Sequence, residues 1–521
     1  MIRFKSLFRT FALFSATLLV GAFFVGCGMP ETSQKLGTKK QKIYNGDLVP
    51  DTYLQVVKIR GGSCTGILLD HRRVITAAHC VCKDGDCNYY SNIRIGLNDG
   101  TEIQAGFVAH PSYSYSTKNY DVAMLQLVSD APIDVAYEYP LLASQAPEVG
   151  DAITIVGFGY SDCNSSNEYI SLGDRRIGTN DISGFRSSNL RFKSSATNGE
   201  VTMPGDSGGP SFVTRNGNRE LAGLTRGLVG NTNLCTDSSA EVDYTNLYLM
   251  LDWIKGSIKN NIALEASNNK YVTTSGTNLV ANQDGPYGST KLSIMDLNGG
   301  ELQAGDEIYL MSNNGKFWTV DTNLTASNTQ TGADQKFTIY KVVSGSPVSD
   351  GSTLSDQDTI ALKSDSGKWV TLSGSTLVAT SSTYSSNAAL TYHRYDHIYN
   401  PTSMRCYQAL SSASGSKIKR ANCSDSSLQK FVWYNNYMLQ LKGTNLCIRA
   451  ELPTNTSGKN LKLANCNTSA NDQTFIRVGS QLRPKANSSY CLQRKPNSGY
   501  IESRKCLSAA NNKNWITPHR P

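Results

Sequence analysis

The sequence has little charge for its length. Asp, Glu, Lys and Arg make up only 18% of its 521 residues, and the formal net charge is +8. It contains no long stripe of basic residues, so we do not expect nucleic acid as a partner. It also contains no CxxC cysteine pair, which argues against a zinc site, and we expect neither a metal nor a cofactor.

Glycine and tyrosine, by contrast, are plentiful. The chain has 44 Gly and 26 Tyr, together with many Ser, Thr and Asn residues. Such a composition is typical of turn-rich, all-β proteins that work outside the cell. At about 100–200 residues per domain, the length favours about three domains.

The N-terminal segment indicates export. Three basic residues precede an uncharged apolar run over residues 11–26, which has the length of a signal-peptide core and is short for a membrane span. The run ends in Phe24-Val25-Gly26-Cys27, which resembles a bacterial lipobox with Phe24 in place of the usual Leu. This resemblance implies a lipid anchor on Cys27 and a precursor in the bacterial cell envelope. An ordinary signal peptide cleaved nearby is the alternative, and it predicts a secreted chain.

The cysteines favour an oxidising compartment. There are 13, and removal of Cys27 leaves an even number. Cys163 and Cys235 stand apart from the others and can pair with each other. The other cysteines form neighbouring couples along the chain: Cys64/Cys80, Cys82/Cys87, Cys406/Cys423, Cys447/Cys466 and Cys491/Cys506.

The pattern of apolar residues divides the chain into segments. A signal peptide over 1–27 is followed by a polar propeptide or linker over 28–42, which is predicted to lack fixed structure. Strand-like alternation runs from Ile43 to about residue 245. Apolar residues then recur at helical spacing from Leu247 to Ile258, which predicts an amphipathic helix that closes a first domain over 43–260.

A threefold repeat of roughly 40–50 residues follows the first domain. Similar segments begin at Ile262, Ile308 and Ile360, and each continues through a turn and a Lys-aromatic pair. These segments resemble fascin-like β-trefoil repeats, which implies a β-trefoil over 261–395. The aromatic residues that recur with the repeat are interpreted as core: Tyr271, Phe317, Trp318 and Trp369.

A second threefold repeat over 396–521 opens and closes each unit with a cysteine. It resembles a ricin-type β-trefoil, which implies one disulfide in each unit and makes this lobe a candidate for binding a glycan or the cell surface. The family's galactose site uses an Asp two residues after each opening cysteine, and this chain has Gln408, Arg449 and Gln493 there. An inert spacer or a protein-docking surface is the alternative.

Three motifs in the first domain carry chemistry. They are Thr-Ala-Ala-His79-Cys80, Tyr-Asp121-Val-Ala and Gly205-Asp-Ser207-Gly-Gly-Pro. A serine becomes nucleophilic when an imidazole takes its proton and a carboxylate orients that imidazole. The motifs predict that His79, Asp121 and Ser207 form such a triad.

Residues 43–260 resemble the trypsin-like (chymotrypsin-fold) serine peptidases in these motifs and in their order. The resemblance implies an all-β fold, a chymotrypsin-like double β-barrel with a C-terminal helix, followed here by the two β-trefoil domains. It implies protein substrates and an acyl-enzyme mechanism. It also implies that the backbone N–H groups of Gly205 and Ser207 form the oxyanion hole.

The resemblance further implies a zymogen. Lys42 precedes Ile43, which stands where the family has its new N-terminus, so cleavage between them is expected. The Ile43 ammonium would then pair with Asp206 and form the oxyanion hole. The cleavage would also separate the enzyme from a lipid on Cys27. The alternative is that residues 28–42 serve only as a tether, and both roles are compatible.

The specificity pocket departs from that of trypsin. The resemblance places Val201 at the base of the pocket, where trypsin-type enzymes have an Asp that meets Lys or Arg. Gly227 matches the open wall of the pocket, beside Thr225, and Val242 narrows it. We therefore expect an apolar P1 residue, the one before the scissile bond, and no self-activation after Lys42.

Two functions compete. The first is an active endopeptidase that its trefoils direct to a surface. The second is a lectin-like adhesin or surface-binding protein with a silent protease fold. The intact triad motifs and Gly205 favour the enzyme.

Overall fold

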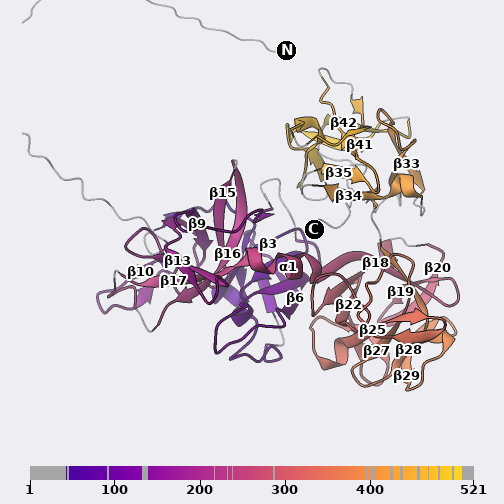
Figure 1. Cartoon of the computed structure of the whole chain (residues 1–521), viewed down its shortest axis with the longest axis horizontal. Coiled ribbons are helices and arrows are strands. Elements are labelled where there is room, and N and C mark those ends of the chain that lie inside the picture. The colour runs from indigo at the N-terminus through magenta and orange to yellow at the C-terminus, as the bar shows by residue number, and fades with distance from the viewer. Residues whose placement is uncertain are drawn as a thin grey trace, which may run out of the picture. The chain divides into compact units, whose positions relative to one another are not determined.

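The structure is a computed structural model of the chain, and part of the chain is described by it. This part comprises residues 43, 46–90, 93–131, 139–215, 217–230, 233–237, 239–285, 288–394, 397–400, 405–422, 426–434, 438–453, 458–467, 469–478, 481–495 and 498–506. The predictions for Cys27, Lys42 and Cys423 fall outside these residues. Within them the fold is all-β with one α-helix, α1 (Leu251–Gly256) (Figure 1). No helix in this part is long and apolar enough to cross a membrane.

A closed six-stranded barrel begins the fold. Its strands pair antiparallel in the cyclic order β2-β3-β4-β7-β6-β5. Apolar residues such as Val57, Ile95 and Leu125 fill its interior and are almost wholly buried. The strands are β2 (Val56–Ile59), β3 (Cys64–Leu68), β4 (Arg73–Thr76), β5 (Ile93–Gly96), β6 (Glu102–Ala109) and β7 (Ala123–Leu127).

A nine-stranded sheet follows, in the order β1-β12-β9-β15-β16-β17-β14-β13, with β8 beside β16. Its core includes Ile155, Phe192 and Tyr244. Together with the barrel and the short helix, it agrees with the predicted chymotrypsin-like fold. The strands are β1 (Asp47–Leu48), β8 (Leu141–Leu142), β9 (Ala152–Gly157), β12 (Arg176–Asp181), β13 (Gly184–Arg186), β14 (Arg191–Ser195), β15 (Pro210–Arg215), β16 (Asn218–Leu228) and β17 (Glu241–Asn246).

The predicted helix over residues 247–258 is shorter in the structure. A 3₁₀ turn over Leu247–Met250 leads into α1, which ends at Gly256. A Cβ at Gly256 would lie 2.1 Å from the backbone of Gly300, so this close approach requires glycine. Ile258 was predicted to end the helix, but it instead begins β18 (Ile258–Ala266). The chain therefore passes from the helix into the next sheet almost without a linker.

A thirteen-stranded sheet over residues 258–394 has threefold character. Six strands pair in a ring, β18-β21-β22-β25-β27-β30 and back to β18. Three hairpins, β19–β20, β23–β24 and β28–β29, extend from the ring, one in each repeat. The ring strands after β18 are β21 (Leu292–Asp296), β22 (Glu307–Ser312), β25 (Lys336–Val343), β27 (Thr359–Ser364) and β30 (Leu390–Arg394). The remaining strands are β19 (Tyr271–Ser275), β20 (Asn278–Gln283), β23 (Phe317–Val320), β24 (Leu324–Asn328), β26 (Ser346–Val348), β28 (Trp369–Ser373) and β29 (Thr376–Ser381).

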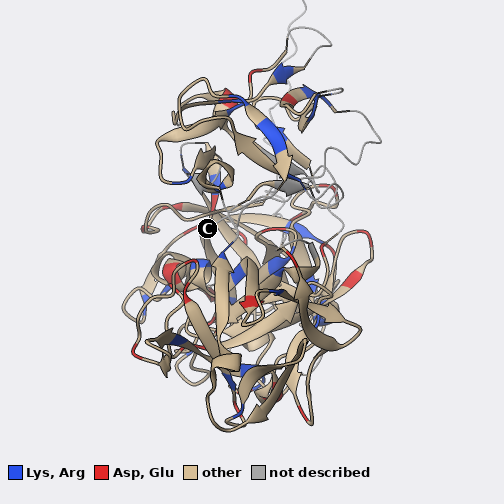
Figure 2. Cartoon of the chain, turned by 90° about the vertical axis from the view of Figure 1, so that its right-hand side faces the viewer, with Lys and Arg blue, Asp and Glu red and all other residues tan. Residues whose placement is uncertain are grey.

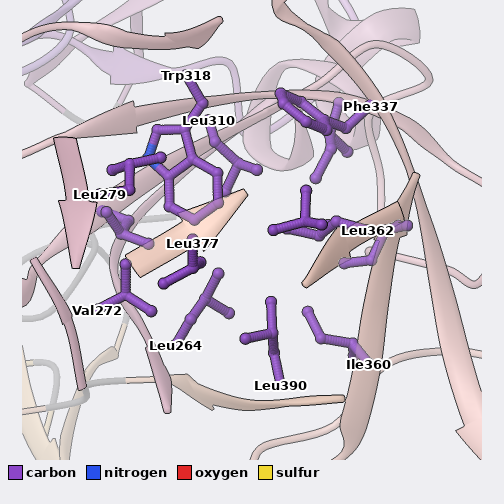
Figure 3. Packing of buried hydrophobic residues seen from close by; sticks show 14 of the residues in the cluster. Leu264, Val272, Leu279, Leu310, Trp318, Phe337, Ile360, Leu362, Leu377 and Leu390 are labelled. Carbon is purple, nitrogen blue, oxygen red and sulfur yellow. The ribbon is translucent and has the colours of Figure 1, made fainter. Parts of the chain in front are cut away.

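The core of this sheet takes one residue from the start of each hairpin. Val272, Trp318 and Val370 are buried in one cluster with leucines from all three repeats (Figure 3). The prediction that the four recurring aromatic residues are core is confirmed for Phe317, Trp318 and Trp369, which are buried, but only Trp318 lies in this cluster. Phe317 is buried in another cluster, with Trp253 of α1, because neighbouring residues of a strand face opposite sides.

The other two aromatic residues also lie away from the central cluster. Trp369 is buried in a small cluster with Ala361 and Ala388, and Tyr271 is only half-buried. Both precede a core valine in the same way that Phe317 precedes Trp318. The sequence repeat therefore predicted that these aromatic side chains are buried, but not the side of the strand on which each one packs.

The last lobe consists of short strands around one apolar cluster that includes Tyr407, Phe431 and Phe475. Its strands are β31 (Tyr399–Asn400), β32 (Arg405–Ala409), β33 (Ile418–Asn422), β34 (Phe431–Tyr434), β35 (Met438–Leu441), β36 (Leu446–Arg449), β37 (Lys459–Asn460), β38 (Lys462–Asn465), β39 (Phe475–Val478), β40 (Gln481–Pro484), β41 (Tyr490–Arg494) and β42 (Ile501–Lys505). Basic and acidic residues are interspersed along the chain in the view of Figure 2.

Five of the predicted disulfides are present: Cys64–Cys80, Cys82–Cys87, Cys163–Cys235, Cys447–Cys466 and Cys491–Cys506. Cys406 is also disulfide-bonded, and its predicted partner Cys423 lies outside the described residues. Each bridge closes a loop and so reduces the conformational freedom of the unfolded chain.

Candidate active site

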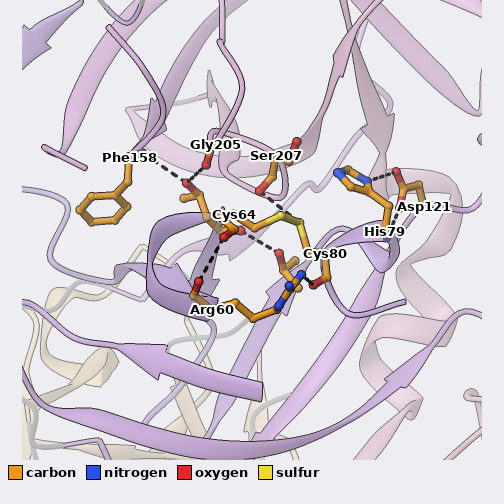
Figure 4. The surroundings of a disulfide bond; sticks show 11 residues. Arg60, Cys64, His79, Cys80, Asp121, Phe158, Gly205 and Ser207 are labelled. Atoms are coloured by element: carbon orange, nitrogen blue, oxygen red, sulfur yellow. Dashed lines mark hydrogen bonds and ion pairs between the residues drawn. A yellow bond between two sulfur atoms is a disulfide. The ribbon is translucent and has the colours of Figure 1, made fainter. Parts of the chain in front are cut away.

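His79 lies in a 3₁₀ turn over Ala78–Cys80, directly after barrel strand β4. The disulfide from Cys80 to Cys64 ties this turn to β3. The imidazole Nδ1 lies 2.7 Å from Oδ2 of Asp121, and the His79 backbone N–H donates to Oδ1 of the same carboxylate at 2.9 Å (Figure 4). These two contacts fix the orientation of the ring.

Asp121 immediately precedes the buried residues that lead into β7, and its side chain is 2% exposed. From the nine-stranded sheet, the Thr245 hydroxyl donates to the Asp121 carbonyl oxygen at 3.1 Å. Burial raises the pKa of Asp121, but the charge and hydrogen bonds of His79 outweigh burial and hold the pKa below its ordinary value. The carboxylate is therefore ionised beside the imidazole.

Ser207 lies in a tight turn before β15. Its carbonyl oxygen accepts the Thr65 N–H at 2.8 Å and lies 3.4 Å from Cys80 Sγ, so the turn is held close to the histidine-bearing segment (Figure 4). Gly208 has a φ of +79°, and a Cβ there would lie 2.0 Å from the Thr76 hydroxyl oxygen. Within the described residues the Ser207 hydroxyl makes no hydrogen bond, and such catalytic bonds commonly tighten only around substrate.

Gly205 adopts a φ of +97°, which favours glycine. Its carbonyl oxygen accepts the Thr65 hydroxyl at 2.9 Å. In the part of the chain that the structure describes, the N–H groups of Gly205 and Ser207 donate to no protein group. Both donors are therefore available to an oxygen of a bound substrate.

Thr65 is a residue that sequence reasoning missed. Its hydroxyl accepts the Phe158 N–H at 3.2 Å while it donates to Gly205, and its own N–H holds Ser207. This wholly buried side chain joins the barrel to the turn that carries the nucleophile. A threonine after a cysteine offers no sequence signal for such a role.

Asp206 is buried, and its carboxylate forms no ion pair within the described residues, although the charge of Arg176 acts to lower its pKa. Its carboxylate accepts the N–H groups of Gly159 at 2.7 Å and of Met203 at 2.8 Å. Burial raises the pKa of Asp206 to about 7, and these two hydrogen bonds oppose the rise. The side chain of Ile43 is 1% exposed and packs in the cluster that contains Met203.

The four predicted pocket residues are all in the nine-stranded sheet or next to it. Val201 and Val242 are buried in one cluster, Thr225 is buried, and Gly227 has open space at its Cβ position. None of these side chains carries a charge. Cys163, which is bonded to Cys235, packs against the same cluster.

One group of described residues has ligand atoms close enough together to hold a metal ion: Cys64, His79 and Cys80. The two sulfur atoms of this group are joined in a disulfide. Since a thiolate is the form of cysteine that binds metals, these atoms do not make a metal site.

Comparisons with known proteins find similarity to serine proteases. A family model described as Trypsin matches residues 43–254. Trypsin of Phaedon cochleariae is 25% identical over 207 residues, which cover 37% of this chain and 77% of that protein. Serine protease 7 of Drosophila melanogaster is 28% identical over 261 residues (42% and 65%), and spermosin of Halocynthia roretzi is 27% identical over 228 residues (38% and 58%). The chain thus spans less than two thirds of the length of the last two relatives.

Proposed function

Because residues 43–254 form a trypsin-like serine protease domain, we propose that this serine endopeptidase works through a Ser-His-Asp triad. Ser207 is the nucleophile, His79 the general base and acid, and Asp121 the residue that orients the imidazole. The observation that carries this proposal is the 2.7 Å contact between His79 and Asp121, made beside the turn that holds Ser207.

The reaction follows from these positions. Ser207 Oγ attacks the peptide carbonyl carbon while Nε2 of His79 takes the hydroxyl proton and then gives it to the leaving amine. Water hydrolyses the acyl-enzyme by the same route in reverse. The free N–H groups of Gly205 and Ser207 bind the developing oxyanion, and one such donor contributes about 3–4 kcal/mol to transition-state stabilisation.

We further propose that the chain is exported as a zymogen and is cut between Lys42 and Ile43. The burial of the Ile43 side chain and the lack of an ion pair for buried Asp206 within the described residues support this step. A new ammonium at Ile43 would supply the missing charge, since an unpaired buried carboxylate is costly. If Cys27 carries a lipid, the same cleavage releases the enzyme from the membrane.

The pocket residues support a preference for an apolar P1 residue. At the expected base of the pocket Val201 supplies no carboxylate, so a bound Arg or Lys would lose its hydration there without compensation. We predict that peptides with Ala, Val or Leu at P1 are cleaved at least about tenfold more efficiently than peptides with Arg. A P1 peptide library measured with the processed enzyme checks this, and efficient cleavage after Arg would contradict it.

We propose that the two C-terminal lobes are β-trefoils that target the enzyme to a glycan or a cell surface. The ring of six strands with three hairpins supports the first trefoil, and the repeated disulfides support the second. The full-length Ser207→Ala chain should then sediment with isolated cell-envelope glycan, and a soluble polysaccharide should release it. Failure to sediment with any envelope fraction would leave the lobes as spacers. The alternative of an adhesin with a silent protease fold is not favoured, because all three triad residues are present.

A further inference from the structure

We propose that Arg226, assisted by Lys118, forms a cationic subsite that binds an acidic substrate residue on the acyl side of the scissile bond. This inference rests on the proposed proteolytic function and adds a second determinant of specificity to the apolar pocket. It rests on two observations. Arg226 lies beside the turn of the nucleophile, and its side chain has no anionic partner among the described residues.

Arg226 lies where strand β16 leaves its neighbour and approaches the nucleophile. The pairing of β15 with β16 ends at Pro210 and Leu224. Thr225 is then hydrogen-bonded to the turn after Ser207. Its N–H donates to the carbonyl oxygen of Gly209 at 2.8 Å, and its carbonyl oxygen accepts the N–H of Gly208 at 2.7 Å. The register with β17 shifts between Thr225 and Gly227, so Arg226 is the extra residue of a bulge.

Bulges re-aim side chains at the edges of sheets and beside active sites. The side of β16 that β15 has left is available to an extended peptide, which can bind as an added strand. An arginine at this position therefore lies beside the part of the substrate that precedes the scissile bond.

The guanidinium of Arg226 is a cation without a partner among the described residues. Its half-buried side chain makes no hydrogen bond or ion pair there, and its Nε is buried with no acceptor. Burial lowers the pKa of Arg226, and the nearby carboxylates of Asp121 and Asp243 oppose that shift. A buried donor left without an acceptor is costly, so the group favours an anionic ligand.

The two nearby carboxylates already have other partners, although Oδ1 of Asp243 accepts no hydrogen bond within the described residues. Asp121 is held by the ring and backbone of His79. Asp243, 2% exposed, pairs with Arg191 and lies 3.2 Å from Nε of Arg186. Neither acid has the freedom to move onto Arg226 without breaking these contacts.

The next carboxylate in this region is occupied as well. Glu241 pairs with both Arg186 and Lys193. Three cations, Arg186, Arg191 and Lys193, thus share these two carboxylates, and Arg226 adds a further positive charge beside them. An acidic ligand would offset that charge.

Lys118 adds a second positive charge on the same side. It is exposed, has a φ of +61° and lies in the loop between β6 and β7, three residues before Asp121. The charge of Arg226 is the largest of the causes that lower the pKa of Lys118. An acidic side chain bound between them would meet both, and charge-assisted hydrogen bonds of this kind are the strong ones.

The test uses the processed, full-length enzyme and a set of peptide amides. Each carries the preferred apolar P1 residue and either Glu or Gln at one of the three preceding positions, P2, P3 or P4. We expect a kcat/KM at least about 10-fold higher for Glu than for Gln at one of these positions, and a ratio that falls as salt rises. In Arg226→Gln this ratio should fall to about one, while Arg226→Lys should retain part of it.

The ratio is measured within each variant, so a smaller amount of folded enzyme does not change it. Arg94→Gln, which removes an exposed arginine of the barrel, is the matched control and should keep the wild-type ratio. Equal cleavage of the Glu and Gln peptides by wild type, or an unchanged ratio in Arg226→Gln, would overturn the subsite. Failure to cleave any peptide, together with no labelling by a serine-reactive probe, would instead overturn the proposed function on which the subsite rests.

Discussion

Replacement of Ser207 by alanine should lower kcat about 10⁵-fold to 10⁶-fold on a peptide with an apolar P1 residue. The substitution removes the only atom that forms the covalent bond to the substrate, while the N–H donors of Gly205 and residue 207 remain. Loss of the nucleophile in a triad has an effect of this size, and the oxyanion hole leaves a small residual rate above that in water. Initial rates of the processed enzyme measure the effect.

A serine-reactive phosphonate distinguishes loss of chemistry from loss of folding. The probe should label processed wild type and not Ser207→Ala, while both variants unfold at the same temperature. Ser166→Ala, which alters an exposed loop serine, is the matched control and should keep full activity and labelling. Activity retained by Ser207→Ala, or labelling of a different serine, would contradict the assignment of the triad.

Blocking the activation cleavage is expected to have the second-largest effect. The substitution Lys42→Gln should leave the chain uncut and lower kcat/KM by about 10³-fold or more. An oxyanion-hole donor contributes about 10²–10³ in rate, and the turn between Gly205 and Ser207 contains both donors. That turn also contains Asp206, whose buried carboxylate forms no ion pair within the described residues and would gain one from a new ammonium at Ile43.

The uncut and cut chains should also differ in the pH dependence of stability. The pKa of Asp206 is about 7 in the uncut fold and about 3.8 when exposed. The folded state then holds the proton longer than the unfolded state, so this group's contribution is fully present below pH 4 and is lost as the pH rises through 7. After cleavage the ammonium favours the ionised carboxylate, and that loss should shrink. Urea denaturation of both forms at pH 4, 5.5 and 7 measures the difference.

Lys40→Gln is the matched control for the activation experiment. It removes a nearby lysine of the same segment but keeps the bond between Lys42 and Ile43, so activation should proceed normally. N-terminal sequencing of the active wild type should read Ile43 first. Full activity of an uncut chain, or an active form that begins upstream of Ile43, would show that residues 28–42 serve only as a tether.

Sequence motifs predicted much of the candidate site because its residues lie within short, characteristic segments. His79, Asp121, Ser207 and Gly205 could be named from their neighbours alone. Thr65 could not, since its importance comes from hydrogen bonds to residues more than 90 positions away. Such contacts depend on the packing of the barrel against the second sheet.

Arg226 shows a second limit of sequence reasoning. Its chain neighbours, Thr225 and Gly227, were predicted to line the pocket, but the sequence did not show that its charge lacks a partner. That conclusion required the positions of Asp243 and the arginines that occupy it. Pairing among charges from several strands is a property of the folded chain, because screening and distance decide which pairs form.

By itself, the sequence predicted the all-β class, the threefold repeats and the proposed reacting groups, because these depend on local patterns of side chains. Only the tertiary structure decided that the helix ends at Gly256, that Phe317 packs away from Trp318, and that Arg226 forms no ion pair with any described residue. Each of these outcomes depends on which surfaces meet when distant strands pack together. A single chain segment carries no information about its partner across such a contact.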